Sequence, residues 1–326
     1  MTSDTKGFFS RLLSLIVFSL VLSGTSKATL LLDKVGELGT ARGHEKIIDA
    51  RPLSSCRQST LQGAICLPVE DFLAPNRRLA NWPGIAWLLG TADLSGDEHV
   101  LIIGQQSDRR NFLGGLLLLM GQRRITILDA PISAHIASHN GQFPGKNRST
   151  TRTTVYTALM RSERIVLKSE ITHATGTLFL DGRTEREYYG VVIRGVRGGH
   201  IPGAMLSPAA LWSENPETLH AQINGVQAVA YAHDIYETLS YLAVLYAAGL
   251  TVSVYLPGWV EWATDGNLPV DSVSYPVAGK IKTAPAVSKT TGIVVSRSGF
   301  MSVLTVIGAL LIASFYAGRK FGLKEA

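Results

Sequence analysis

Short apolar runs alternate with longer, helix-like segments along most of this chain. The apolar runs lie at residues 46–49, 99–103, 124–128, 177–181, 226–231 and 251–255. Segments rich in Leu, Ala and Gly follow the runs at 99–103 and 226–231, as expected for helices. Buried parallel strands form continuous apolar runs, and helices connect them across the sheet. The pattern therefore predicts an α/β fold of parallel sheets covered by helices.

An internal repeat divides the chain into two similar halves. The apolar run in each half ends in an Asp-x-Arg motif, at Asp49–Arg51 and at Asp181–Arg183. We place the two domains at residues 29–145 and 170–272. Residues 146–169 carry basic side chains among Ser and Thr, so we interpret them as a linker.

The two ends of the chain indicate membrane targeting. Residues 1–28 combine basic residues, a short apolar run and a small-x-small site, which is typical of a signal peptide or an N-terminal anchor. Residues 298–318 carry no charge and are long enough to cross the ~30 Å hydrocarbon core as a helix. Residues 273–297 are rich in Pro, Ser, Thr and Lys and read as a tether. The basic tail at 319–326 predicts a cytoplasmic C-terminus, with the body periplasmic or extracellular.

Composition excludes several classes of protein. Hydrophobic residues make up 46% of the chain and charged residues 17%, which is not the composition of a disordered protein. A net charge of +6, dispersed along the chain, gives no indication of nucleic-acid binding. Two cysteines are too few for a four-thiolate zinc site or a disulfide framework. We expect neither a metal nor a cofactor.

The second half carries motifs that resemble the rhodanese (thiosulfate sulfurtransferase) family in its tandem two-domain form. They are Asp181-Gly182-Arg183, the segment RGGHIPGA at 197–204, GWVEW at 258–262 and LPV at 268–270. The first half matches through Ile48-Asp49-Ala50-Arg51-Pro52, and the resemblance covers about two thirds of the chain. It implies two rhodanese-like α/β domains, each with a five-stranded parallel sheet flanked by helices. The resemblance also implies that the domains pack as a pseudo-dimer with a cleft between them.

The resemblance implies a catalytic cysteine directly after the second strand of the active domain, where a loop runs onto a helix. Sulfur transfer needs a thiolate there, with backbone N–H groups and positive charge around the anionic persulfide. Ala232 occupies this position in the second half and Gly104 occupies it in the first. The vestigial loops contain Ala232, His233, Asp234 and Glu237 in the second half, and Gly104 and Arg109 in the first. Both nucleophile positions are therefore empty, and Asp234 and Glu237 add negative charge.

The remaining cysteines and histidines leave alternatives open. Cys56 and Cys66 can form a disulfide, can be two buried small side chains, or can form a displaced persulfide site. His135 and His139 have a spacing that suits a metal on one helix face, but we favour surface histidines because no third ligand is evident. We expect His200 to fix a turn in the Gly-His-Ile-Pro-Gly segment.

Three functional hypotheses follow from these residues. The first is a non-catalytic, membrane-anchored rhodanese-like module that binds a membrane protein or complex, because a fold does not imply its usual activity. The second is a sulfurtransferase or sulfur carrier that uses Cys56 or Cys66. The third is a binding protein for a sulfur oxyanion or another small anion, held by Arg183, Arg197 and His233. We favour the first hypothesis.

Overall fold

The computed structural model describes most of the chain between residues 31 and 272. The described residues are 31–38, 45–138, 142–174, 176–214, 220–221, 223 and 225–272. The predicted signal peptide, tether, membrane helix and basic tail lie outside them. None of the helices within the described residues is long and apolar enough to cross a membrane.

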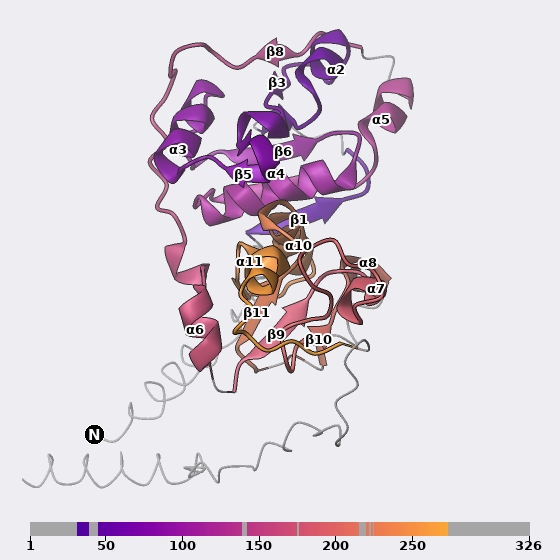
Figure 1. The fold of residues 1–326 in the computed structure, drawn as a ribbon. Helices are drawn as coiled ribbons and strands as arrows, with labels where there is room; N and C mark the ends of the chain where they lie inside the picture. The colour runs from indigo at the N-terminus through magenta and orange to yellow at the C-terminus, as the bar shows by residue number, and fades with distance from the viewer. Residues whose placement is uncertain are drawn as a thin grey trace, which may run out of the picture. The chain divides into compact units, whose positions relative to one another are not determined.

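The first half forms a six-stranded, all-parallel sheet (Figure 1). Its strands, in spatial order, are β1 (Leu32–Val35), β7 (Arg124–Leu128), β6 (His99–Ile103), β2 (Lys46–Asp49), β3 (Ile65–Cys66) and β8 (Lys146–Asn147). The helices of this half are α2 (Leu53–Gln58), α3 (Trp82–Thr91), α4 (Ser107–Leu119) and α5 (Ile132–Ser138). A small antiparallel hairpin lies between α2 and α3: β4 (Leu73–Ala74) and β5 (Arg78–Leu79), with the short 3-10 turns η1 (Val69–Asp71) and η2 (Pro75–Arg77).

The second half forms a four-stranded parallel sheet. Its strands, in spatial order, are β10 (Met205–Leu206), β9 (Leu178–Asp181), β11 (Ala228–Tyr231) and β12 (Ser253–Val254). The elements around them are η3 (Ser162–Arg164), α6 (Lys168–His173), α7 (Glu185–Tyr188), α8 (Ala209–Glu214), α10 (Ile235–Ala247) and α11 (Gly258–Thr264). All six predicted apolar runs are strands, which confirms the parallel sheets flanked by helices.

The strand counts differ from the two five-stranded sheets that the resemblance implies. The first sheet gains an edge strand because β8, from the predicted linker, pairs with β3. The second sheet has four strands, extended at one edge by a single parallel bridge between Ile165 and Val254. Segments of one or two residues at sheet edges carry too little apolar pattern for the sequence to specify them.

The repeated Asp-x-Arg motif performs the same structural task in both halves. In the first, the Arg51 guanidinium donates to both carboxylate oxygens of Asp49, at 3.0 and 2.7 Å. In the second, Arg183 makes the same two bonds to Asp181, also at 3.0 and 2.7 Å. Each carboxylate lies at the carboxyl end of its strand and is fully buried. A buried charge needs a partner, so the repeat reflects a paired-ion strand terminus rather than a ligand site.

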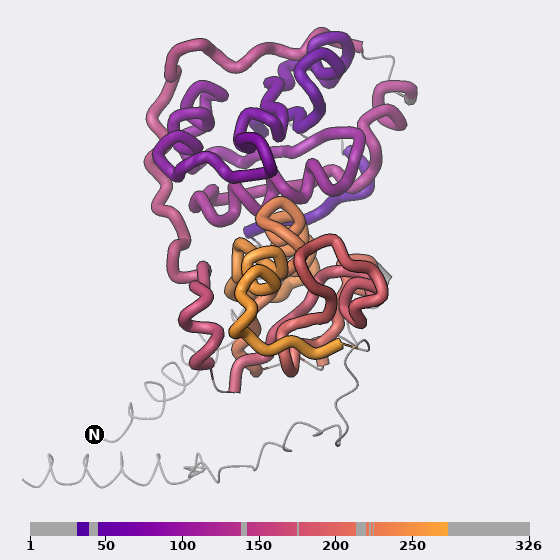
Figure 2. The backbone as a smooth tube through the Cα atoms, in the orientation of Figure 1, coloured from indigo at the N-terminus to yellow at the C-terminus, as the bar shows by residue number. Residues whose placement is uncertain are grey.

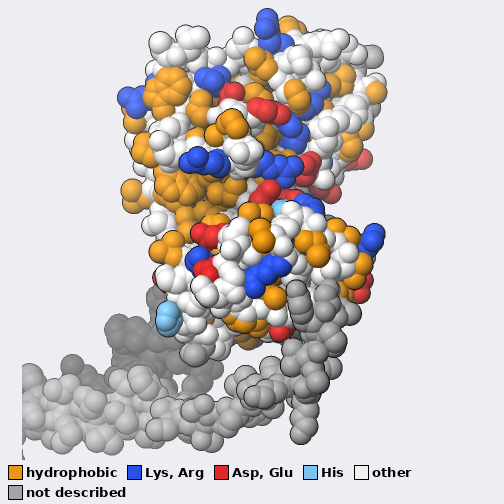
Figure 3. Space-filling view, viewed as in Figure 1, with side chains coloured by type: hydrophobic (Ala, Val, Ile, Leu, Met, Phe, Trp, Pro, Cys, Tyr) orange, Lys and Arg blue, Asp and Glu red, His pale blue; other side chains and the backbone are white. Residues whose placement is uncertain are grey.

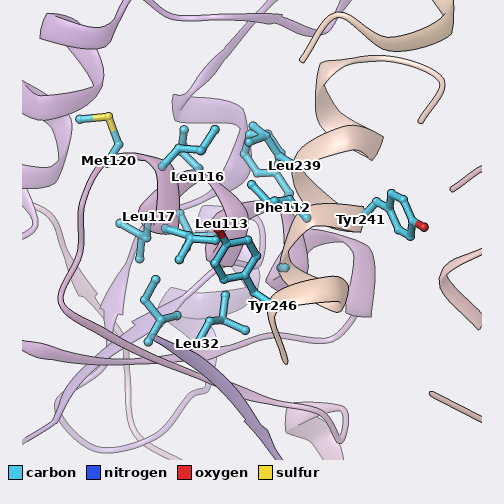
Figure 4. Packing of buried hydrophobic residues seen from close by; sticks show 14 of the residues in the cluster. Leu32, Phe112, Leu113, Leu116, Leu117, Met120, Leu239, Tyr241 and Tyr246 are labelled. Carbon is cyan, nitrogen blue, oxygen red and sulfur yellow. The ribbon is translucent and has the colours of Figure 1, made fainter. Parts of the chain in front are cut away.

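Helices α4 and α10 join the two halves through one hydrophobic core (Figure 4). The Phe112 and Tyr236 rings stack with centroids 4.9 Å apart. The helices approach so closely that a Cβ on Gly115 would lie 2.0 Å from the Leu239 carbonyl oxygen. One side of α4 packs on β6 and β7 and another on α10, which explains why the part of the helix from Phe112 to Leu119 is apolar on all sides. Both sheets accordingly belong to one compact unit.

The predicted linker lies along the first half before the chain enters the second (Figure 2). After β8, the Thr153 amide donates to the Gly90 carbonyl at 3.1 Å, at the end of α3. Further along, the Thr157 amide donates to Ser95 at 2.9 Å, and the Arg161 amide donates to Leu119 at 2.8 Å. These bonds hold the connection in a defined path over the end of α4.

Candidate functional site

The vestigial loop of the second half runs from the end of β11 into α10. Ala232 follows the last strand residue, Tyr231, and is only 3% exposed. Asp234 begins the helix as its N-cap, where its carboxylate accepts from the Glu237 amide at 2.9 Å. An aspartate is a strong N-cap because it satisfies an amide that has no helical partner. The loop thus runs from the end of a strand to the start of a helix, with the Ala232 methyl group at the position where the resemblance implies a cysteine.

Neighbouring groups already engage the backbone of this loop. The Ala232 amide donates to the Thr238 hydroxyl at 3.0 Å. The Ala232 carbonyl accepts from the Trp259 amide at 2.9 Å, and the His233 carbonyl accepts from the next amide of α11, also at 2.9 Å. An anion placed at Ala232 would therefore have to compete with the Thr238 hydroxyl for the Ala232 amide.

A cluster of paired charges covers the loop. Glu237 accepts two bonds from the Arg194 guanidinium, at 2.6 and 2.8 Å, and Arg194 also donates to Glu187 at 2.6 Å. From the first half, Arg77 in η2 reaches Asp234 at 3.2 Å. Figure 3 shows acidic and basic side chains gathered where the two halves meet. We call Arg77, Glu187, Arg194, Asp234 and Glu237 the ion cluster. It holds three carboxylates and two guanidinium groups, so it does not favour an additional anion.

The protonation states follow from burial and pairing. Hydrogen bonds to Glu237 raise the pKa of Arg194 above its ordinary value. Burial opposes the ionisation of Glu187, but hydrogen bonds from Thr184 and Arg194 outweigh it and lower the pKa of that carboxyl. Burial, followed by the nearby charge of Arg194, lowers the pKa of His233. His233 is thus neutral at pH 7, and its Nδ1 lies 3.9 Å from Glu187 with no hydrogen-bond partner within the described residues.

The corresponding loop of the first half is filled by an arginine. Arg110 is buried and donates to the Gly104 carbonyl at 2.7 Å and to the Asp129 carbonyl at 2.5 Å. A Cβ on Gly104 would lie 3.1 Å from the Arg110 Cγ, so a cysteine there would require this side chain to shift. Arg109, which the sequence singled out, forms an ion pair with Glu70 at 2.5 Å. The buried Arg110 side chain therefore crowds the position where the resemblance implies a cysteine.

The arginines proposed for anion binding are committed to structural contacts. Besides its pair with Asp181, Arg183 donates to the Gly199 carbonyl at 2.7 Å. Burial, the largest single influence, lowers its pKa, but the hydrogen bond to Asp181 and the charges of Asp181 and Glu187 together raise it above its ordinary value. Arg197 donates to carbonyls at the end of α11, at 3.0 Å to Ala263 and 2.5 Å to Asp265. These partners of Arg183 and Arg197 lie outside the loop at 232–237, and among the described residues the structure records no bond that joins Arg183, Arg197 and His233 into one site.

Cys56 and Cys66 form a disulfide, with Cα atoms 5.8 Å apart. Cys56 lies in α2 and Cys66 in β3, and both residues are fully buried. The Gly145 amide donates to the Cys56 carbonyl at 3.1 Å and brings the chain across the disulfide before β8. Since the chain has two cysteines, the oxidised protein has no free thiol.

The structure corrects the interpretation of His135 as a surface residue. His135 is buried because it shares a helix face with Ile132 and Ile136, which pack into a small apolar cluster. His139 lies outside the described residues. His200 does fix a turn: its ring stacks on Tyr188 and its Nδ1 lies 2.8 Å from the Tyr188 carbonyl oxygen. Within the described residues, no group of three His, Cys, Asp or Glu side chains could hold a metal ion.

Three arginines contact these loops without a clear signal in the sequence: Arg77, Arg194 and Arg110. Arg77 and Arg194 reach the vestigial loop from distant segments, and Arg77 and Asp234 are separated by 157 positions in the sequence. Arg110 lies beside Arg109 in the polar first turn of α4, where an arginine is normally exposed. The one available signal was the loss of a side chain at Gly104, which leaves room for a large neighbour.

Several solved structures share this fold. A variant of EanB in complex with ergothioneine matches with a TM-score of 0.58 and 17% identity, over 73% of this chain and 67% of that chain. A probable thiosulfate sulfurtransferase matches with a TM-score of 0.53 and 23% identity, over 72% of this chain and 99% of that chain. An anaerobic ergothioneine biosynthesis enzyme from Chlorobium limicola, bound to trimethyl histidine, gives 0.57 and 16%, over 73% and 67% of the two chains. The fold is therefore rhodanese-like.

No protein-family profile and no curated protein sequence matches the chain.

Proposed function

We propose that this chain is a membrane-anchored, extracytoplasmic, tandem rhodanese-like protein that has lost sulfurtransferase activity and binds a partner at the bilayer. One observation carries the proposal: neither strand-to-helix loop has a nucleophile, at Ala232 or at Gly104, and the only two thiols are joined in a buried disulfide. Sulfur transfer requires an accessible thiolate, so the fold is retained without the group that performs the chemistry.

The packing around the two loops supports a loss of sulfurtransferase activity that goes beyond the missing thiol. The Arg110 side chain packs against the vacated position at Gly104, and the ion cluster covers the loop at Ala232. Restoring the reaction would require more than a thiol, because Asp234 and Glu237 would raise the pKa of a cysteine beside them. Such compensating contacts are expected in a protein retained for its surface.

The two alternatives have less support. A sulfurtransferase that uses Cys56 or Cys66 would need the buried disulfide to be reduced and then exposed. An anion-binding protein would need Arg183 or Arg197 to leave its carboxylate or carbonyl partners. Binding of a membrane protein or complex needs neither change, and the predicted anchor would raise the effective concentration of the module beside such a partner.

The experiment is a thiosulfate:cyanide sulfur-transfer assay on the full chain, with and without a reductant. Ala232→Cys is the test variant and Ala232→Ser is its matched control without a thiol. We expect no activity from the unsubstituted chain in either condition, and none from Ala232→Cys. Activity of the unsubstituted chain would overturn the proposal and direct attention to Cys56 and Cys66. Activity gained by Ala232→Cys alone would leave the non-catalytic assignment intact and contradict the role given to the ion cluster.

Partner binding is tested separately, by purifying the full chain from membranes in mild detergent after crosslinking. A stoichiometric membrane protein should accompany it. Recovery of the chain alone, at every crosslinker concentration, would count against the binding role.

A further inference from the structure

The connection between α7 and β10 begins as a closed loop. Gly190 and Gly198 meet at its neck, where a Cβ on Gly198 would lie 2.9 Å from the Gly190 Cα. The Val192 amide donates to the Arg186 carbonyl of α7 at 2.9 Å and ties the start of the loop to that helix. Residues between the two glycines therefore project from the body as one preformed unit. We call residues 190–198 the apolar loop.

The tip of the apolar loop is hydrophobic and faces solvent. Val191, Ile193 and Val196 are 62%, 57% and 75% exposed. Arg194 lies among them in sequence, but its guanidinium turns back to Glu187 and Glu237 in the ion cluster. Single exposed apolar residues are ordinary, whereas several on one small loop mark an interaction site.

Contacts with α11 fix the apolar loop from beneath. The Trp259 indole donates to the Arg197 carbonyl at 3.2 Å. The Arg197 side chain in turn donates to carbonyls at the end of α11, at Ala263 and Asp265. The loop is thus held in shape before it meets anything, which reduces the ordering entropy that binding would cost.

The chain leaves the described body beside the stem of this loop. His200, two residues after the neck, pairs with Asp271: its amide donates to the Asp271 carbonyl at 2.8 Å and its carbonyl accepts from the Asp271 amide at 3.1 Å. From residue 273 the sequence predicts the tether, and from residue 298 the membrane helix. A random-coil chain of about 25 residues has a root-mean-square span of about 25–30 Å. The predicted tether would therefore keep the apolar loop close to the bilayer.

We infer that the apolar loop inserts its tip, Val191, Ile193 and Val196, into the headgroup region of the lipid bilayer. The inference rests on the anchored topology of the proposed function. A projecting tip of aliphatic side chains with its one arginine turned inward suits a lipid surface, where apolar groups bury ~5–10 Å deep without a complementary groove. Arg194 belongs to the apolar loop and bonds to Glu187 and Glu237 of the ion cluster, so it connects the loop to the vestigial site.

The experiment uses the full chain reconstituted in phosphatidylcholine–phosphatidylglycerol vesicles with ordinary or brominated acyl chains. Val196→Trp places an indole at the tip. Leu159→Trp is the matched control, since Leu159 is 88% exposed and lies on the connection between the halves. Brominated chains quench only indoles that reach the acyl boundary, so emission added by Val196→Trp should be lost and emission added by Leu159→Trp should remain.

A second variant keeps the test independent of the indole. Val191→Asp in the Val196→Trp background should abolish the quenching while leaving the melting temperature unchanged, because Val191 is exposed. Equal quenching of Val196→Trp and Leu159→Trp would overturn the inference. The inference would also be overturned if the Val196→Trp indole were shielded from solvent in native membranes but not in pure lipid vesicles. That result would mean that a protein covers the tip. Vesicle flotation reports the anchor separately: a chain that fails to float refutes the anchored topology, and a floating chain without quenching refutes only the lipid contact.

Discussion

The crossing of α4 and α10 yields the sharpest quantitative prediction, because two adjacent glycines differ in what a methyl group would meet. At Gly115 an added Cβ would lie 2.0 Å from the Leu239 carbonyl oxygen, which belongs to the backbone of α10. At Gly114 it would lie 2.6 Å from the Ile127 Cδ1, the far end of a flexible side chain. Gly115→Ala should therefore destabilise the protein, and Gly114→Ala is its matched control.

The magnitude follows from two opposing effects. Carbon and carbonyl oxygen atoms rarely approach within about 3.3 Å, so α10 would have to move by roughly 1 Å at Gly115. Overpacking costs about 1–3 kcal/mol, and a clash with backbone atoms, which cannot rotate away, lies near the upper end of that range, at about 2–3 kcal/mol. The gain in helix propensity from Gly to Ala offsets about 1 kcal/mol of this cost. We expect a net loss of about 1–2 kcal/mol for Gly115→Ala, against a change near zero for Gly114→Ala, where the isoleucine can rotate.

The assay is urea and thermal unfolding of the full chain in detergent, followed by circular dichroism. At about 2–4 °C per kcal/mol for a unit of this size, Gly115→Ala should melt roughly 2–8 °C below the parent. Since α4 and α10 carry the main contact between the halves, the same variant should make the connection between them more accessible to protease. Coincident melting curves for the two variants would refute the close approach of the helices.

Three further outcomes follow from the ion cluster, the buried histidine and the disulfide. Arg194→Met leaves a buried carboxylate unpaired and should cost about 1–3 kcal/mol of unfolding free energy, whereas Arg77→Met, which breaks a more exposed pair, should cost under about 1 kcal/mol; equal losses in urea titrations would contradict the geometry. Burial lowers the pKa of His233 below its ordinary 6.5, so the unfolded chain takes up the proton first and stability falls as pH drops below 6.5. His233→Gln should flatten this loss in melting temperatures measured between about pH 7 and pH 5, and an unchanged pH profile would refute the burial of this imidazole. Replacing Cys56 and Cys66 together with Ser should cost about 2–3 kcal/mol and abolish any effect of reductant on the melting temperature, and a reductant effect that persists would show that the disulfide is not its source.

The sequence predicts the sheets well because their signals are local. All the apolar runs became strands, and the two Asp-x-Arg motifs became equivalent strand termini, since a run of four to six apolar residues and a charged pair two residues apart need no distant partner to be recognised. The edge strand β8 escaped prediction, because two exposed polar residues become a strand only when β3 is beside them.

The sequence showed which positions lack a cysteine, but it did not show which side chains surround those positions. Ala232 and Gly104 stand out in the sequence because the resemblance implies a cysteine after the second strand of the active domain. The residues that fill the space do not stand out: Arg77 meets Asp234 only through the packing of the two halves, and Arg110 is buried only because Gly104 is small. His135 shows the same limit, since one polar residue on an apolar helix face does not reveal which face is buried.

The path of the connection between the halves sets an order of assembly during synthesis. When residue 145 has emerged, the first half still lacks β8 and the contacts of Thr153, Thr157 and Arg161 with α3, Ser95 and Leu119. The edge of β3 therefore stays unpaired until residues 146–147 have been synthesised and have formed β8. A nascent chain that pauses before this point presents an unpaired parallel edge to chaperones. Shortening the connection would accordingly impair the maturation of the half that precedes it.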